Sequence, residues 1–353
     1  MGRMLADIVD YLICPVCRAD VRLDGSTLRC AAGHSFDVAK QGYVSLLVGN
    51  RPPGTADSRE MVAARAAFLD QGHYAPLMEA VAEAVTEAVR AYATSDNVPE
   101  KHESSTETND GGELRAYRVA GVEAGFGVGR GGPGQEPGFV EDRRVEGRAA
   151  PVIVDAGTGT GHYLGAALTA INDGIGMAFD VSKHAVRRAA RVHPRAGAFV
   201  ADVWRPLPIR SGVADVVIDV FAPRNGPEFR RILRPDGVAV VVTPAPSHLS
   251  PLVGELGLLS VDEEKERRVA RSLDGFAESD RRSIEFEMEL EHGDIAKVIG
   301  MGPNAWHNEP ARLDERIAAF VARNGAAGQR KVVTRAAFQL SIFEPVPRSR
   351  PVA

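Results

Sequence analysis

The chain has few of the features that are typical of secreted, membrane or strongly basic proteins. Its 353 residues include only three cysteines, which cannot build a disulfide framework. No apolar run reaches the roughly 18 residues that a membrane-spanning helix needs. The net charge of −5 gives no sign of a dominant nucleic-acid-binding surface, although it leaves room for a local basic face. The first residues carry acids within their apolar part and lack a signal-peptide layout. We therefore expect a cytoplasmic protein that makes no membrane contact.

All three cysteines lie in one short stretch, and a histidine follows the last of them. Cys14, Cys17, Cys30 and His34 form the pattern C-x2-C-x12-C-x3-H. Two ligand pairs about a dozen residues apart can close a tetrahedron around one zinc ion. Unpaired cysteines in a small core are the alternative. Because four protein ligands leave no open coordination position, we predict a structural zinc site in a ribbon or knuckle domain over residues 1–50. A segment this short buries little core, and a metal would supply the missing stability.

Composition divides the rest of the chain into three regions. Residues 51–95 begin with a Pro/Gly turn and continue as an Ala-rich helical pattern, with Asp57 or Ser58 as the expected N-cap. Residues 96–150 are rich in Gly, Ser, Glu and Pro without periodicity, which predicts a disordered insertion acting as a neutral linker. A glycine-arginine tail that binds RNA is the alternative reading. Residues 151–353 form the third region.

Apolar runs alternate with helical patterns in this third region, which predicts an α/β fold. Strands are expected at 151–157, 174–182, 196–203, 213–223 and 238–246, and helices at 162–173, 183–194 and 226–237. Such alternation is typical of a Rossmann-like parallel sheet that is covered on both faces. Two later segments, 283–294 and 332–345, fit antiparallel edge strands.

A glycine-rich turn follows the first of these strands. The strand ends at Asp155, and Gly157, Gly159 and Gly161 precede a helix. Glycines let a backbone turn sharply and approach a ligand closely. The spacing differs from the dinucleotide fingerprint G-x-G-x-x-G. It resembles the first motif of class I S-adenosylmethionine-dependent methyltransferases, where the loop passes the amino-acid part of the cofactor.

Two further acids end the next two predicted strands. Asp180 lies about 20 residues beyond the glycine turn, where an acid accepts hydrogen bonds from ribose hydroxyls. Asp202 ends the third strand, where methyltransferases of this kind recognise adenine. Each acid alone could equally be a loop carboxylate or an N-cap. Together with the glycine turn they predict an S-adenosylmethionine site.

Arginines gather in two stretches of a chain whose net charge is negative. Arg187, Arg191 and Arg195 are spaced four apart and share one face if the predicted helix continues. A second group comprises Arg224, Arg230, Arg231 and Arg234. Such clusters could grip phosphates, or they could simply form a solvated helix face.

A zinc module in front of a methyltransferase core resembles the bacterial 23S rRNA (guanine-N1)-methyltransferases. The resemblance extends through "GHSFDVAKQGYVSLL" (33–47), "DSREMVAARAAFLDQGHYAPL" (57–77), the glycine turn, "FAPRNGPEFRRILRPDGVAVVVTPAPSHL" (221–249) and "MGPNAWH" (301–307). It spans nearly the whole chain except residues 96–150. "DVW", "VFAPRN" and "MGPNAWH" look most like the tylosin-resistance branch, which modifies guanine 748 in the hairpin 35 loop of 23S rRNA. The other branch modifies guanine 745.

The resemblance implies roles for further residues. Zinc would be held by the Cys/His cluster, and the cofactor would be contacted by Tyr74, Tyr163, Leu164 and His248. A homodimer gripping RNA between its subunits is also implied. Tyr74 could instead be a core tyrosine, and His248 a loop histidine. The 96–150 insertion departs from the family pattern and must loop out if Tyr74 is to reach the cofactor.

Methylation at N1 of guanine requires an unpaired or flipped base and an acceptor for the N1 proton. Asp219, near the end of the fourth strand, is the nearest candidate carboxylate, although its side chain could point away. Trp306 could stack on the flipped guanine, or it could be a core residue.

Two other functions remain open at this stage. The first is a small-molecule methyltransferase of the quinone-biosynthesis kind, which would leave the zinc module and the arginines without a role. The second is a zinc-dependent RNA-binding protein with an inactive methyltransferase core.

Overall fold

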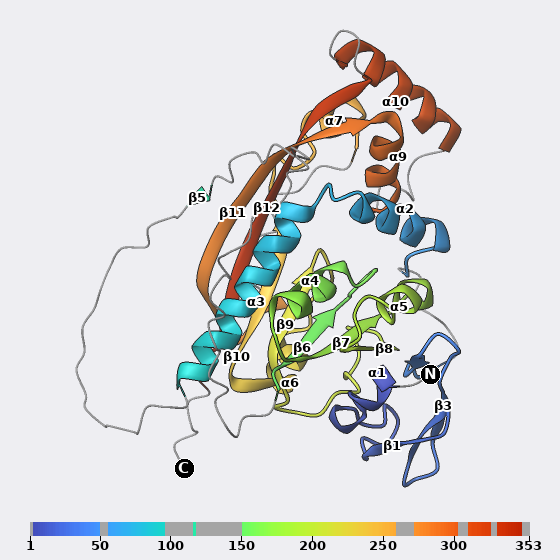
Figure 1. Cartoon of the computed structure of the whole chain (residues 1–353), viewed down its shortest axis with the longest axis vertical. Helices are drawn as coiled ribbons and strands as arrows, with labels where there is room; N and C mark the ends of the chain where they lie inside the picture. Colours follow the sequence, from blue (N-terminus) through green and yellow to red (C-terminus); the bar gives the residue numbers. More distant parts are fainter. Residues whose placement is uncertain are drawn as a thin grey trace, which may run out of the picture.

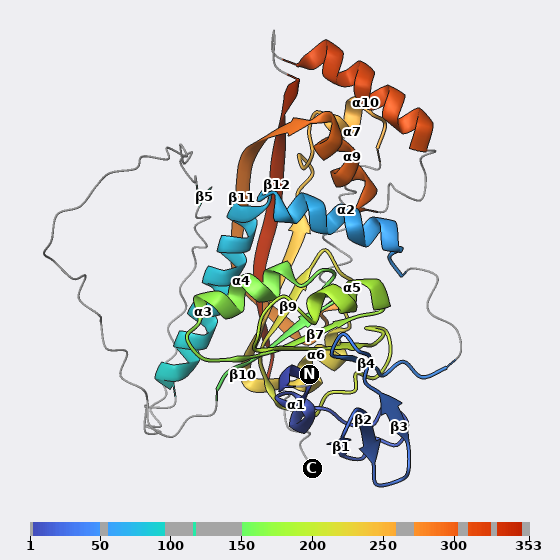
Figure 2. The ribbon, with the colours of Figure 1, turned by 45° about the vertical axis from the view of Figure 1, so that its right-hand side comes forward.

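A nine-stranded sheet runs through the molecule, with a small three-stranded sheet at one end of it (Figures 1 and 2). The computed structural model describes residues 3–49, 56–95, 116–117, 150–258, 272–302, 310–325 and 330–347. Within this part of the chain, no helix is long and apolar enough to cross a membrane.

The strand order of the large sheet is β4-β8-β7-β6-β9-β10-β12-β11-β5. The bounds are β4 Tyr43–Ser45, β5 Ala116–Tyr117, β6 Val152–Ala156, β7 Ile175–Asp180, β8 Ala196–Val200, β9 Ala214–Val220, β10 Leu233–Pro244, β11 Phe276–Glu291 and β12 Lys331–Pro345. Neighbours from β4 to β10 are parallel, whereas β12 is antiparallel to both β10 and β11. The predicted parallel sheet and the antiparallel direction of its late strands are therefore confirmed, but β12 pairs with strands on both sides and is not an edge strand. Chain order reverses between β6 and β9, where such sheets form a crevice at their carboxyl edge.

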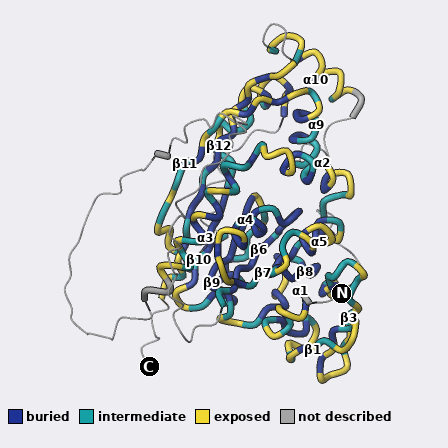
Figure 3. Tube along the Cα trace, viewed as in Figure 1, coloured by how far each residue is buried: buried dark blue, intermediate teal, exposed yellow. Residues whose placement is uncertain are grey.

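Helices cover one face of this sheet, and α6 shares the other with the N-terminal segment. The first face carries α2 Arg59–Asp70, α3 Ala75–Ser95, α4 His162–Ala170 and α5 Lys183–Ala189. The second face is covered by α6 Gly226–Ile232 and by α1 Arg3–Ala6 and η1 Val9–Tyr11. The long antiparallel pair of β11 and β12 extends away from this centre, and α7 Leu252–Glu255, α9 His292–Gly300 and α10 Pro310–Asn324 lie at its far end (Figure 1). The dark-blue trace in Figure 3 shows that the buried residues concentrate along the central strands.

Local chemistry explains where several helices begin and end. Ser58 is the N-cap of α2, since its side chain accepts a hydrogen bond from the backbone N–H of Met61 at 3.2 Å. The helix predicted at 183–194 ends at Ala189, and the one predicted at 226–237 ends at Ile232. In the second case Leu233 already belongs to β10, and Pro235 cannot donate the backbone bond that a continuing helix needs.

The N-terminal segment is less separate than the predicted 1–50 domain. Its own sheet contains β1 Val21–Asp24, β2 Thr27–Cys30 and β3 Ser35–Asp37. However, β4 joins the large sheet beside β8, and Leu46 N–H donates to the carbonyl of Val200 at 2.9 Å. Residues 1–50 are therefore built partly into the sheet.

The predicted disordered insertion, 96–150, falls mostly outside the described residues. Within it, Ala116–Tyr117 forms β5, a short parallel edge strand beside Ser283 and Ile284 of β11. This pair of residues departs from the prediction of a linker without secondary structure.

Candidate functional site

A cavity of about 520 Å³ opens at the carboxyl edge of the sheet, where β6, β7, β8 and β9 end. Its size is in the range of small-molecule sites. Eleven residues were predicted for the cofactor site or for catalysis, and seven of them line the cavity. These seven are Tyr74, Asp155, Gly157, Gly159, Tyr163, Asp180 and Asp202, whereas Gly161, Leu164, His248 and Asp219 do not line it. Parallel strands bring these side chains together because their carboxyl ends meet at one edge.

The glycine turn forms the floor of the cavity. Gly157, Gly159 and Gly161 all have positive φ angles, between 53° and 84°, which side chains rarely adopt. A Cβ atom at Gly157 would lie only 2.5 Å from the Cβ of Ala222. Gly161 is the N-cap of α4, and Leu164 is fully buried in the core. Gly161 and Leu164 therefore do not line the cavity.

Two of the predicted acids are held in place by hydrogen bonds. The carboxylate of Asp180 accepts the backbone N–H groups of Gly159 at 2.9 Å and Ser182 at 2.7 Å. Asp155 accepts the hydroxyl of Thr158 at 2.6 Å. Burial raises the pKa of Asp155 to about 7, and burial also raises the pKa of Asp180. The third acid, Asp202, accepts the backbone N–H of Trp204 at 3.0 Å.

Tyr74 connects the cavity to His248. The Tyr74 hydroxyl lies 3.2 Å from Nε2 of His248, and the backbone N–H of Ala337 donates to Nδ1 of the same ring at 3.3 Å. Since Nδ1 accepts, Nε2 carries the proton and donates to the tyrosine oxygen. Burial raises the pKa of Tyr74 well above its usual range, so its hydroxyl stays protonated. His248 thus orients a cavity-lining residue and does not itself line the cavity.

Sequence reasoning missed three cavity residues, Arg65, Trp204 and Phe221. Arg65 forms an ion pair with Asp57 and donates to the carbonyl of Met301 at 2.8 Å. Among the cavity-lining residues that the structure describes, it is the only arginine or lysine. Trp204 and Phe221 are cavity-lining aromatics that are 63% and 43% exposed. An aromatic residue just beyond a strand-terminal acid was the available signal for Trp204, whereas nothing local singles out Arg65 within its helix.

Asp219, the predicted acceptor of the N1 proton, does not line the cavity. Successive side chains of a strand point to opposite faces, and it is Val220 that lines the cavity. Asp219 is completely buried, and its carboxylate lies 3.1 Å from Nε of Arg224. Burial raises the pKa of Asp219, and the positive charge of Arg224 beside it opposes this rise.

The predicted basic face is also largely absent. Because α5 ends at Ala189, Arg191 and Arg195 do not share its face. Arg195 donates to the carbonyls of Leu168, Ile171 and Gly174 and so caps the carboxyl end of α4. Arg187 and Arg191 are exposed.

The second arginine group is committed to structural contacts. Arg224 and Arg234 pair with Asp219 and Asp215, Arg231 pairs with Glu228, and Arg230 donates to backbone carbonyls. Trp306, the predicted stacking residue, lies outside the described residues.

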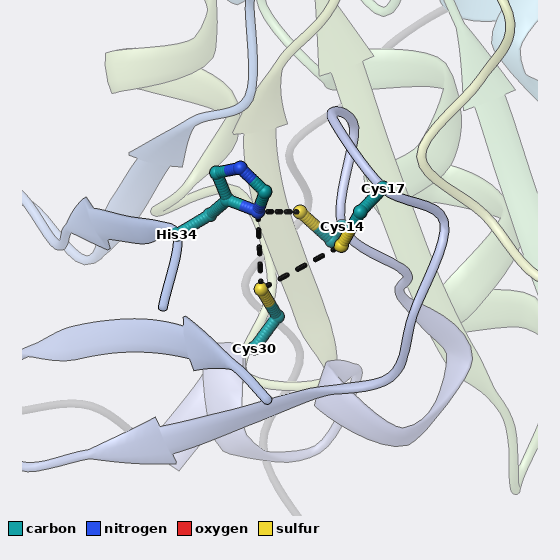
Figure 4. Close-up of side chains that lie close together, drawn as sticks. All are labelled: Cys14, Cys17, Cys30 and His34. Carbon is teal, nitrogen blue, oxygen red and sulfur yellow. Dashed lines mark hydrogen bonds between the residues drawn. The ribbon is translucent and has the colours of Figure 1, made fainter. Parts of the chain in front are cut away.

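The predicted zinc ligands converge on one point (Figure 4). Cys14 and Cys17 come from the turn that precedes β1, and Cys30 and His34 come from the connection between β2 and β3. Nδ1 of His34 lies 3.6 Å from Sγ of Cys14 and 3.3 Å from Sγ of Cys30, and the sulfurs of Cys17 and Cys30 are 3.7 Å apart. A tetrahedral zinc ion with ordinary bond lengths requires about 3.8 Å between sulfurs and about 3.6 Å between sulfur and nitrogen. The four residues therefore fit one structural zinc ion.

This zinc ribbon is docked on the loop that follows β8. Arg18 donates to the carbonyl of Leu207 at 2.8 Å, and Ile13 N–H donates to the carbonyl of Pro208 at 3.0 Å. Arg210 forms an ion pair with Asp20 at 2.8 Å. The same loop supplies the cavity residues Asp202 to Trp204, so one loop contacts both the zinc ribbon and the cavity.

Comparison with known proteins agrees with both halves of this architecture. A zinc-ribbon family model described as "RlmA, N-terminal" matches residues 12–51. The 23S rRNA (guanine(748)-N(1))-methyltransferase of Streptomyces fradiae is 42% identical over 318 residues, which cover 89% of this chain and 92% of that protein. A Micromonospora griseorubida protein provisionally named a 23S rRNA (guanine-N(1)-)-methyltransferase is 42% identical over 348 residues, 97% of this chain and 100% of its own.

Solved structures include a phosphoethanolamine N-methyltransferase of Haemonchus contortus in complex with S-adenosyl-L-methionine, with a TM-score of 0.33 and 13% identity over 56% of this chain and 49% of that one. The identity to the curated relatives, over nearly the whole chain, decides the family. The chain belongs to the 23S rRNA (guanine-N1)-methyltransferases.

Proposed function

We propose that this protein transfers the methyl group of S-adenosylmethionine to N1 of guanine 748 in the hairpin 35 loop of 23S rRNA. The observation that carries the proposal is the position of the cavity. It lies at the β6–β9 crevice of a chain that is 42% identical over 89% of its length to the guanine(748) enzyme of S. fradiae. Modification of this guanine would place the protein in the cytoplasm and in the tylosin-resistance branch.

The cavity residues supply complementary contacts for such a cofactor. Asp180 is oriented by two backbone N–H groups and keeps lone pairs for the ribose hydroxyls. Asp202 lies where adenine would be recognised, and the glycine turn leaves room for the amino-acid part. We add Arg65 to this set. Its guanidinium lies beside Gly159, with 3.1 Å between Nη1 and an ideal Cβ at that glycine, and could bind the cofactor carboxylate.

Tyr74 and Tyr163 complete the pocket, and His248 fixes the hydroxyl of Tyr74 from behind. S-adenosylmethionine supplies an electrophilic methyl group on a sulfonium. The residues of this chain would therefore act mainly by positioning, since in-line attack needs the two reacting atoms aligned at close range.

RNA contacts would come from the rim of the cavity, from the zinc ribbon and from the exposed Arg187 and Arg191. In this proposal two copies of the chain grip the hairpin, as the family resemblance implies. A quinone-type methyltransferase would need neither the ribbon nor RNA. A filter-binding assay with the hairpin RNA distinguishes that alternative from an rRNA methyltransferase. Calorimetry with S-adenosylmethionine distinguishes an active enzyme from an RNA-binding protein with an inactive core.

Primer extension on 23S rRNA tests the proposal directly, because an N1-methyl guanine blocks reverse transcription. We expect a stop at guanine 748 in cells with the gene, its loss in a knockout, and its return with wild-type protein but not with Asp180→Ala. A stop at guanine 745 instead would assign the protein to the other branch. An unchanged stop at 748 in the knockout would overturn the proposal.

A further inference from the structure

We propose that Phe221 is the stacking platform for the target guanine and that the Asp219–Arg224 ion pair holds it in position. This inference rests on the proposed function and specifies how its substrate base is bound. It arises from one short segment, residues 219–224, which begins in the last two residues of β9 and leads into the lining of the cavity.

The backbone of Phe221 is held in an unfavourable conformation. Its φ angle is +59°, a region that bulky residues rarely adopt, and such strain costs about 1–3 kcal/mol. The strain is not offset by burial, since 43% of the side chain remains exposed. A residue that is both strained and exposed is poorly explained by stability alone. Strained residues of this kind cluster at ligand sites.

The ring of Phe221 is supported from the protein side. Its centroid lies 5.5 Å from that of Phe338 and 6.4 Å from that of Tyr163, whose ring meets it edge-on at 85°. Both neighbours belong to the buried core. Aromatic contacts at these separations favour a fixed ring orientation. The remaining surface lines the cavity and can receive a flat ligand.

An ion pair joins the two ends of the segment that contains Phe221. Asp219, two residues before it, and Arg224, three residues after it, approach to 3.1 Å with side chains that are 0% and 10% exposed. Burying two charges is expensive, and apolar residues of similar volume often stabilise a fold as well or better. This pair therefore serves geometry more than stability. Between its two ends, Ala222 fits against Gly157, where no Cβ could be accommodated.

The chemistry of the substrate requires such a platform. N1 lies on the Watson–Crick edge, so the guanine must leave its pairing and stacking partners before it can react. An aromatic face compensates for the lost stacking and leaves the whole edge free. Ala222, the next residue after Phe221, lies against the glycine turn, where the amino-acid part of the cofactor would lie. A base stacked on it would be close to the methyl group.

The test compares Phe221→Ala with Phe221→Tyr in the full-length, zinc-loaded protein. Val333→Ala is the matched control, because Val333 is an exposed apolar residue away from the cavity. Methylation of hairpin 35 RNA gives kcat/KM, and calorimetry gives the affinity for S-adenosylmethionine. We expect Phe221→Ala to lower kcat/KM about 10- to 100-fold, with the cofactor affinity changed less than about threefold. Phe221→Tyr and Val333→Ala should stay near wild type.

A fluorescent base separates stacking from general damage. At saturation, the fluorescence of RNA that carries 2-aminopurine at the target position should be lower on the wild-type protein than on Phe221→Ala. The double variant Asp219→Leu/Arg224→Met removes the ion pair without leaving a buried charge, and it should reproduce both effects of Phe221→Ala while melting cooperatively. Full activity and wild-type quenching in this double variant would overturn the role of the ion pair.

The outcomes distinguish this inference from the proposed function. If the wild-type protein methylates the hairpin and Phe221→Ala matches it in both assays, the platform is wrong and the function stands. If the wild-type protein does not methylate the hairpin, the proposed function fails and the platform fails with it.

Discussion

The zinc ribbon and the sheet that carries the cavity are stabilised in different ways, yet they share a loop and a core. The ribbon has three strands of three or four residues and four converging metal ligands. The sheet is stabilised by continuous burial along its central strands. Leu5, Ile8 and Leu12 nevertheless pack in the same hydrophobic cluster as Phe179 and Phe199 of the sheet. The metal therefore stabilises a part of the protein that packs against the sheet carrying the cavity.

Removal of a zinc ligand should give the largest effect on this arrangement. Cys17→Ser takes away the exposed ligand, and we expect loss of zinc, unfolding of the ribbon and at least a hundredfold drop in rRNA methylation, on the order expected for a structural zinc site. Because the loop after β8 contacts both regions, the affinity for S-adenosylmethionine should also fall severalfold.

Zinc content by mass spectrometry, rRNA methylation and calorimetry measure the three effects. Val16→Ala, an exposed residue between two ligands, is the control. An unchanged cofactor affinity in zinc-free Cys17→Ser would show that the ribbon is a separable arm, as the sequence first suggested.

A smaller effect should follow from damage confined to the cavity. Arg65→Ala removes the guanidinium beside the glycine turn, and we expect about 10- to 100-fold weaker binding of S-adenosylmethionine, the usual range for a charge-assisted hydrogen bond. Zinc content should stay at one ion per chain. S-adenosyl compounds that lack the carboxylate provide the control, since their affinity should change little on the same substitution. Equal losses for both ligands would mean that Arg65 only supports the fold.

The smallest effect concerns the way in which the free energy of unfolding depends on pH through a buried acid of the sheet. Burial raises the pKa of Asp155 to about 7, above the value of about 3.9 in an unfolded chain. Between these values the folded state binds the extra proton, so this group lowers the free energy of unfolding as pH rises from about 4 to about 7. Asp155→Asn should remove up to about 1.4 kcal/mol per pH unit of that decline.

Urea unfolding at pH 5, 6 and 7 with excess zinc measures the difference in slope. The asparagine can still accept the Thr158 hydroxyl, so the local hydrogen bond is retained. Parallel curves for the two proteins would contradict the raised pKa.

Much of the cavity was predictable because the signals are local. The glycine turn, Asp180 and Asp202 each follow a strand, and parallel strands must end at the same edge of a sheet. The role of Arg65 was not predictable, because its partners Asp57 and Met301 are 8 and 236 residues away in the chain. The burial of Asp219 away from the cavity was not predictable either, since proximity to a strand end does not tell which face a side chain occupies.

The spacing of Cys14, Cys17, Cys30 and His34 alone determined the metal site, and the alternation of apolar runs determined the α/β class. Tertiary structure decided the rest. It placed β4 of the predicted zinc domain in the large sheet, turned Arg195 into a helix cap, and set Phe221 at the mouth of the cavity with Asp219 buried behind it. The physical reason is the distance along the chain over which each kind of signal acts. Ligand spacing and strand periodicity act within about a dozen residues, whereas the burial and partners of a charged or aromatic side chain depend on elements brought together only by folding.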